Sequence, residues 1–187
     1  MIREVSETIA DLIESSAPEL APWVSHVGLE SDSNTLPNDG LVLSLYSIEE
    51  NGHMRNRPPE LDGEHFRRAA MSMRLSYLVF FNGAATPTQH LETQSRLDRV
   101  AQIFHTNPIL GPAILAPSLI GVIDRLAVRL WSPTAEERNQ IWTAFGRPMR
   151  LALYYLVETV PIVPTQADGS TPITTETIEY GVEAGLS

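Results

Sequence analysis

The chain has 187 residues, enough for one ordinary domain and few for two. Its 23 acidic and 13 basic residues give a net charge of −10, which argues against a nucleic-acid-binding protein because such proteins need a basic face. All 13 basic residues are arginine. The absence of cysteine excludes disulfides, Cys-based zinc sites and thiol catalysis.

Neither a leader nor a membrane span is expected. Charged residues begin at Arg3, so the N-terminal segment lacks the apolar core of a signal peptide. The longest stretch without formal charge lies between Arg99 and Asp124, but three prolines interrupt it and would break a membrane helix. We interpret it as a buried or interface loop. A protein assembled in the cytoplasm is the expectation.

The first half of the chain alternates between periodic apolar segments and polar loops. Apolar residues recur at helical spacing over 5–13 and predict a helix that ends near Pro18. Residues 41–51 alternate as a strand covered on both faces. Residues 52–69 are too polar for a core and predict an extended excursion, after which 70–83 predict a long strand.

The middle of the chain predicts a helix and a half-exposed strand. The helix is expected to have Thr88 as its N-cap, an apolar stripe that includes Leu97, and an end at Asn107-Pro108. The strand lies within 121–132, with Arg125 and Arg129 on its wet face. Its core face would carry Val122, Leu126, Val128 and Leu130.

The last unit is predicted to be a helix followed by a strand. Thr134 and Glu137 have the spacing of a capping box, in which each side chain binds the other residue's backbone N–H. The helix is expected to run to about Phe145 and to end at Gly146 in a left-handed conformation. Residues 149–162 form the last strand. Its expected core residues are Leu151, Leu153, Tyr155 and Val157.

The elements together predict an α/β (α+β) single domain. We expect a central mixed or antiparallel sheet of about four to five strands, flanked by about three helices, within residues 1–164. Residues 165–187 form an acidic, proline-containing tail. Its segment ITTETIEY has β-forming residues and would suit strand addition to a partner, and a disordered solubilising tail is an equally good interpretation.

No catalytic or metal-binding pattern is present. The five histidines do not have metal-ligand spacing, and there is no nucleophile elbow, dinucleotide fingerprint or phosphate loop. We therefore expect a protein that is not an enzyme and has no cofactor, metal or catalytic residues. A deep pocket that places His26, His53 or His65 beside carboxylates would instead favour a small-molecule-binding domain.

The arginines of the polar excursion are the main candidates for a functional role. Arg55, Arg57, Arg67 and Arg68 lie close to acidic residues of the same segment. Guanidinium groups form planar, bidentate pairs with carboxylates and are enriched at protein interfaces, so a contact between subunits is one interpretation. A solvated loop with local ion pairs is another, and a small-anion site is a third.

Several segments together resemble a known family. The resemblance is carried in the first half by LVLSLYSIEENGHMRNRPP, with Tyr46, Glu50, Asn51, Arg55, Asn56 and Pro58, and by MRLSYLVFFNG, with Leu75, Tyr77 and Leu78. In the second half it is carried by HLETQSRLDRVAQIFHTNPIL, with Leu97 and Asn107-Pro108-Ile109-Leu110, and by the unit from Arg125 to Ile162, with Trp142, Phe145, Pro148 and Tyr155.

These segments are similar to the N-terminal domain of the tail-terminator, or cap, proteins of phage-tail-like contractile injection systems such as the anti-feeding prophage. The resemblance implies a structural protein that forms a six-membered ring on the last layer of tube and sheath, stops tube growth and anchors the sheath. A tail-completion protein of a DNA phage is the alternative. The expected subunit or sheath contacts are Glu50, Asn51, Arg55, Asn56, Arg57, Arg67 and Arg68.

Overall fold

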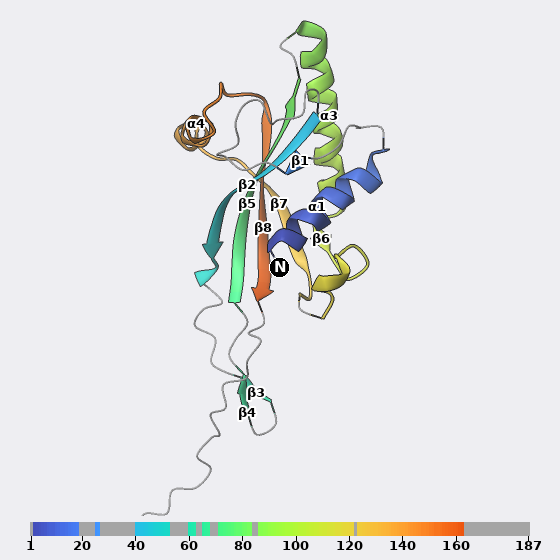
Figure 1. Ribbon diagram of the computed structural model, residues 1–187, viewed down its shortest axis with the longest axis vertical. Helices are drawn as coiled ribbons and strands as arrows, with labels where there is room; N and C mark the ends of the chain where they lie inside the picture. Colours follow the sequence, from blue (N-terminus) through green and yellow to red (C-terminus); the bar gives the residue numbers. More distant parts are fainter. Residues whose placement is uncertain are drawn as a thin grey trace, which may run out of the picture.

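A central sheet with helices on both faces organises the computed structural model (Figure 1). The structure describes residues 2–18, 25–26, 40–52, 60–62, 65–67, 71–83, 86–121 and 123–162. Within these ranges the sheet has six strands in the order β1-β2-β5-β8-β7-β6. Its strands are β1 (Ser25–His26), β2 (Gly40–Glu50), β5 (Met71–Asn82), β6 (Ile109–Leu110), β7 (Leu126–Trp131) and β8 (Ala152–Ile162).

The four long strands β2, β5, β8 and β7 pair antiparallel, whereas the two-residue strand β1 runs parallel to β2. A separate hairpin of β3 (Glu60–Asp62) and β4 (His65–Arg67) lies between β2 and β5 in the sequence. The described helices are α1 (Ile2–Ser16), α3 (Pro87–Thr106), α4 (Ala135–Ala144) and the short 3₁₀ helix η3 (Pro117–Leu119). This arrangement confirms the predicted mixed α+β fold.

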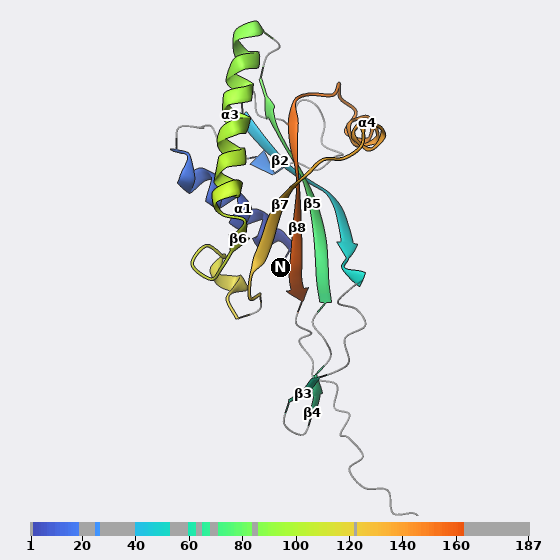
Figure 2. The same ribbon diagram turned by 180° about the vertical axis from the view of Figure 1, so that it is seen from behind.

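The larger core lies between the sheet and the pair α1 and α3, which cover the same face in both views (Figures 1 and 2). Alternate residues of the long strands point into it, as the period of two requires. The apolar faces of α1 and α3 pack against these strand residues and complete the core. Its largest members with under 2% exposure are Tyr77, Ile9, Ile13, Leu43, Leu75, Leu110, Leu119, Leu126 and Val5.

A smaller core lies on the opposite face, beneath α4. Trp142 is 1% exposed and packs edge-on against Phe80, with ring centroids 5.2 Å apart. Its indole N–H donates to the Tyr154 hydroxyl at 3.0 Å, which satisfies the polar atom that burial would otherwise leave unpaired. Since α4 is short, this single side chain provides its main attachment to the sheet.

The ends of α4 confirm the sequence prediction. The Thr134 hydroxyl accepts from the Glu137 backbone N–H at 3.2 Å, and the Glu137 carboxylate accepts from the Thr134 backbone N–H at 2.7 Å. The hydrogen bonds that the Glu137 carboxylate accepts from the Thr134 backbone N–H and from the Thr134 hydroxyl lower the pKa of Glu137. Gly146 has φ of +66°, the left-handed conformation that a glycine adopts without strain.

Three expectations about individual residues are wrong. The N-cap of α3 is Thr86, not Thr88, because Pro87 fits the first helical position and Thr86 accepts from the Gln89 N–H. Leu130 and Leu151 were expected in the core and are 57% and 47% exposed, because no described helix covers those strand ends. Val122 lies outside the described residues.

The uncharged stretch after α3 packs as a loop, as expected. Leu110, Leu115, Leu119 and Ile123 are all at most 5% exposed and belong to the larger core. Among the residues that the structure describes, no helix combines the length and apolar character needed to cross a bilayer.

We expect Trp142→Ala to lower the free energy of unfolding by about 3–5 kcal/mol, because it removes the aromatic anchor and leaves a cavity. Urea denaturation followed by circular dichroism measures the loss. The matched control, Gln140→Ala on the exposed side of the same helix, should change it by no more than about 0.5 kcal/mol. Equal losses in both variants would show that the second core adds little stability.

Burial raises the pKa of Tyr77 to about 12, and its hydroxyl is 2.9 Å from that of Ser6. In the unfolded chain the phenol titrates near 10, so the unfolded state gives up this proton first as pH rises. The stability due to Tyr77 is therefore complete below about pH 10 and is lost towards about pH 12.

As the pH rises through that window, the unchanged chain should lose up to about 3 kcal/mol of stability that Tyr77→Phe does not lose, because phenylalanine has no hydroxyl to titrate. Chemical denaturation at a series of pH values tests this difference. Parallel stability curves for the two proteins would contradict it.

Candidate functional site

Of the residues singled out in the sequence, Glu50 and Asn51 lie where β2 ends. Glu50 is exposed at the end of β2, and the Asn51 backbone N–H donates to the Ser72 carbonyl at 2.8 Å, which joins the two strands at this end. Arg67 lies in β4, opposite Glu60 of β3 in the hairpin register. Arg55, Asn56, Arg57 and Arg68 lie outside the described residues, as do His53 and the tail.

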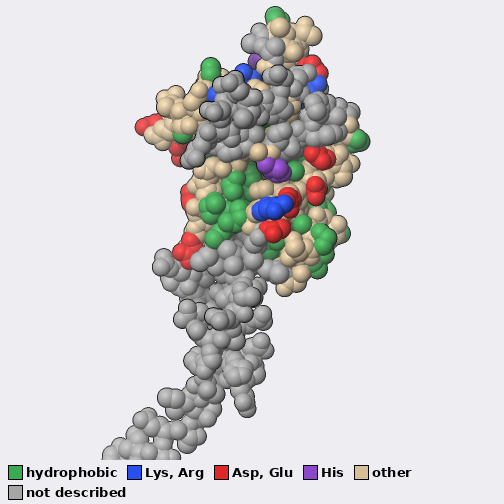
Figure 3. Space-filling view, in the orientation of Figure 1, with side chains coloured by type: hydrophobic (Ala, Val, Ile, Leu, Met, Phe, Trp, Pro, Cys, Tyr) green, Lys and Arg blue, Asp and Glu red, His purple; other side chains and the backbone are tan. Residues whose placement is uncertain are grey.

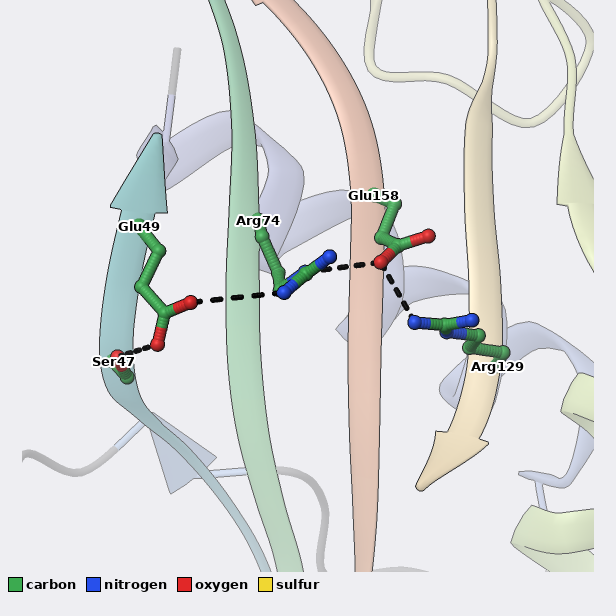
Figure 4. Close-up of polar contacts among 5 residues, drawn as sticks. All are labelled: Ser47, Glu49, Arg74, Arg129 and Glu158. Carbon is green, nitrogen blue, oxygen red and sulfur yellow. Dashed lines mark hydrogen bonds and ion pairs between the residues drawn. The ribbon is translucent and has the colours of Figure 1, made fainter. Parts of the chain in front are cut away.

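A row of alternating charges crosses the sheet near the same end (Figure 4). Glu49 on β2, Arg74 on β5, Glu158 on β8 and Arg129 on β7 each come from a different neighbouring strand. Glu158 accepts from Arg74 Nε at 3.0 Å and from Arg129 Nη2 at 2.8 Å. Arg74 also forms an ion pair with Glu49, in which Nη1 of the guanidinium lies 3.8 Å from Oε2 of the carboxylate. We name these four residues the charge ladder.

The strand register places the charge ladder on the same face of the sheet as α4. The ladder lies at one end of that face, and α4 covers the other end. Arg74 has the same parity as Phe80, and Glu158 the same parity as Tyr154, both members of the smaller core. The outer members, Glu49 and Arg129, are 57% and 59% exposed, whereas the shared Glu158 is 22% exposed. The ladder is therefore a partly hydrated, charged strip on a sheet surface that no described helix covers.

Sequence reasoning found only one member of the charge ladder. Arg129 was expected on the wet face of its strand, and it lies there. The other members were missed because cross-strand pairing is set by register, and single residues of opposite sign on strands far apart in sequence do not signal it.

Exposed large apolar side chains form two further surfaces. One combines Met149 and Leu151, 65% and 47% exposed, with the start of α3. They line a hollow of about 640 Å³ together with residues of α3, and Leu91, 67% exposed, is on the same helix. We name Met149 and Leu151 the upper apolar patch.

The second apolar surface is a groove of about 630 Å³ between β7 and the end of α3. Leu130, 57% exposed, lines it. Ile109, 56% exposed, lies on the short neighbouring strand β6. Because the groove and the hollow at the upper apolar patch are lined by different parts of α3, the molecule has two distinct apolar surfaces.

A third hollow, of about 480 Å³, bears on the small-molecule hypothesis. It is lined by His26 and Glu7 and has Leu43, Leu45 and Tyr77 among its other residues. Figure 3 shows purple, blue and red side chains beside a green apolar area on this face. The Glu7 carboxylate already accepts from Arg3 Nε at 2.8 Å, so it is occupied by a neighbouring cation.

Within the described ranges, no group of three or more histidines and acidic residues is placed to hold a metal ion. His26, His90 and His105 are all exposed. The described geometry thus provides contact surfaces: a charged strip, two apolar areas and an open hollow.

The chain matches a known protein family, and its fold is similar to that of solved structures. Residues 4–176 match the family described as the Pvc16 N-terminal domain. The fold is similar to that of a PVC sheath/tube terminator in the extended state of an extracellular contractile injection system, at 19% identity and a TM-score of 0.68 over 100% of this chain and 65% of that chain. It is also similar to the anti-feeding prophage cap, at 14% identity and a TM-score of 0.62 over 94% of this chain and 60% of that one.

The chain therefore spans less than two thirds of the length of either protein. No curated protein sequence matches it. The family match confirms the resemblance that the sequence segments indicated, and the structural likeness confirms the fold.

Glu158→Gln should lower the stability of the isolated protein by about 1 kcal/mol, because two guanidinium groups lose their shared, partly exposed partner. The loss should shrink in high salt, which screens the remaining repulsion. Thermal unfolding at low and high ionic strength measures both effects. Glu49→Gln, at the exposed end of the ladder, is the control and should have a smaller effect; equal losses would contradict a central role for Glu158.

Proposed function

The chain belongs to the Pvc16 N-terminal domain family, and we propose that it is a structural cap, or tail terminator, of a contractile injection system. In this proposal a ring of copies sits on the last layer of the inner tube and the sheath, ends tube growth and anchors the sheath. The protein performs no catalysis. It is assembled in the cytoplasm as part of a phage-tail-like particle.

The observation that carries the proposal is the agreement between family and fold. The family match covers most of the chain, and both similar structures are described as terminators or caps of such particles. The contact surfaces of the described residues are consistent with this role, since a cap acts through protein contacts.

The distribution of these surfaces favours a ring. A closed ring is built from head-to-tail contacts, in which one surface of a subunit meets a different surface of the next. In this proposal the upper apolar patch and the β7–α3 groove, which lie on different parts of the subunit, are the two surfaces that meet. We propose a ring of about six copies, as the resemblance implies.

We further propose that the polar excursion contacts a neighbouring subunit or the sheath. It leaves the sheet where the Asn51–Ser72 hydrogen bond ends the pairing of β2 with β5, next to the charge ladder. Arginine forks and carboxylates from two subunits would pair there bidentately. The proposed contact residues are Glu50, Asn51, Arg55, Asn56, Arg57, Arg67 and Arg68.

Mass photometry of the purified protein, followed by class averaging of negatively stained particles, tests the ring. The expected result is a closed ring of about six copies, formed alone or when tube and sheath proteins are added. A strict monomer at high concentration with both partners present would overturn the proposal.

Charge reversal of the excursion tests the proposed contact residues. Arg55→Glu combined with Arg57→Glu should reduce assembly, because like charges would face one another across the interface, and should leave the melting temperature within a few degrees. The control is Arg125→Glu combined with Arg138→Glu. These two arginines are exposed, lie outside the excursion and give the same change in net charge. Loss of the fold in the excursion variant would instead identify these arginines as internal supports.

A further inference from the structure

Among the described residues, β6 pairs with only part of the outer edge of β7. The two-residue strand β6 opposes Leu126 and Ala127, and the Val128 N–H then donates to the Pro108 carbonyl at 2.9 Å. Proline has no N–H, so Pro108 cannot return a hydrogen bond to β7. Directions of backbone groups alternate along a strand, and the N–H and C=O of Leu130 therefore point to the same outer side as those of Val128.

This edge borders the groove between β7 and α3. Figure 2 shows β7 at one margin of the four long strands, with β2 at the other. Apolar side chains of Phe104, Val128, Leu130 and Tyr155 line the groove, and none of its described lining residues is acidic. Val128 and Tyr155 are almost completely buried, whereas Leu130, which also lines the groove, is 57% exposed.

An unpaired strand edge beside an apolar groove has the chemistry of a strand-addition site. The backbone of an extended segment would bind the open edge, and alternate side chains would enter the groove. The pairing residues of the segment would also cover Leu130. Because none of the described residues that line the groove is acidic, an acidic segment meets no like charge there.

We propose that the β7 edge receives residues 173–180, ITTETIEY, from the tail of a second copy of this chain. The segment is rich in β-branched residues, and residues 163–187 contain four acidic side chains and no basic one. The eleven residues that follow Ile162, up to Ile173, span up to about 36 Å when extended. Tail and groove are different surfaces, as a head-to-tail ring requires. This inference rests on the proposed ring.

Cysteine pairing tests the proposal directly, because the natural chain has no cysteine to interfere. A Leu130→Cys chain is mixed with an Ile178→Cys chain under mild oxidation, and covalent dimers are separated on a non-reducing gel. A mixture of Gln140→Cys, exposed on α4, with Ile178→Cys is the matched control. We expect several-fold more dimer from the first mixture than from the control.

Two other results would overturn the assignment of a second copy as donor. The first result uses a single chain that carries both Leu130→Cys and Ile178→Cys. If that chain forms the disulfide within itself and the mixture of single-cysteine chains gives no dimer, each chain fills its own groove. Dimer yields equal to the control would show that another segment or partner binds this edge.

Removal of residues 165–187 separates failure of this inference from failure of the proposed function. We expect the shortened chain to lose most of its ring population in mass photometry. A full ring without the tail would overturn the strand exchange and leave the cap proposal standing. A full-length chain that never assembles with tube and sheath would contradict both.

Discussion

The feature on which the rest of the structure depends is the unequal cover of the two faces of the sheet. Four long antiparallel strands present apolar residues to both sides at one end, so both faces must be buried there. Two helices and the loop after α3 bury one face, whereas α4, held mainly by Trp142, buries only one end of the other. The remaining strip of that second face carries charged side chains in place of apolar ones.

That strip has an energetic consequence for assembly. In the isolated protein its ion pairs are partly hydrated and contribute little to stability, since solvent screens them. When a neighbouring subunit covers such pairs, the local dielectric falls and each interaction strengthens, and any group left without a partner becomes costly. A cap that must recognise a particular neighbour gains selectivity from this arrangement, because a wrong partner would bury charges without pairing them.

The sequence was sufficient for those parts of the fold that local chemistry determines. The capping box at Thr134 and Glu137 and the glycine at position 146 correctly marked both ends of α4, because each depends on backbone groups a few residues away. The alternation of strand residues identified most of the core. The Thr86 cap was missed because two threonines flank Pro87, and the preference of proline for the first helical position decides between them.

Long-range features required the structure. Leu130 has the correct parity for the core but is exposed, since burial depends on how far α3 extends along β7. The charge ladder depends on register among four strands that are up to about a hundred residues apart in sequence, and the irregularities beside Leu45 and Met73 shift that register. The excursion arginines, predicted from composition alone, stay a prediction.

The central claim is that this protein ends a growing tube by binding its last layer, and electron microscopy of particles assembled without it tests that claim most directly. The account predicts tubes of variable or runaway length, and restoration of uniform length when the protein is supplied. Particles of uniform length that contract normally in its absence would contradict it.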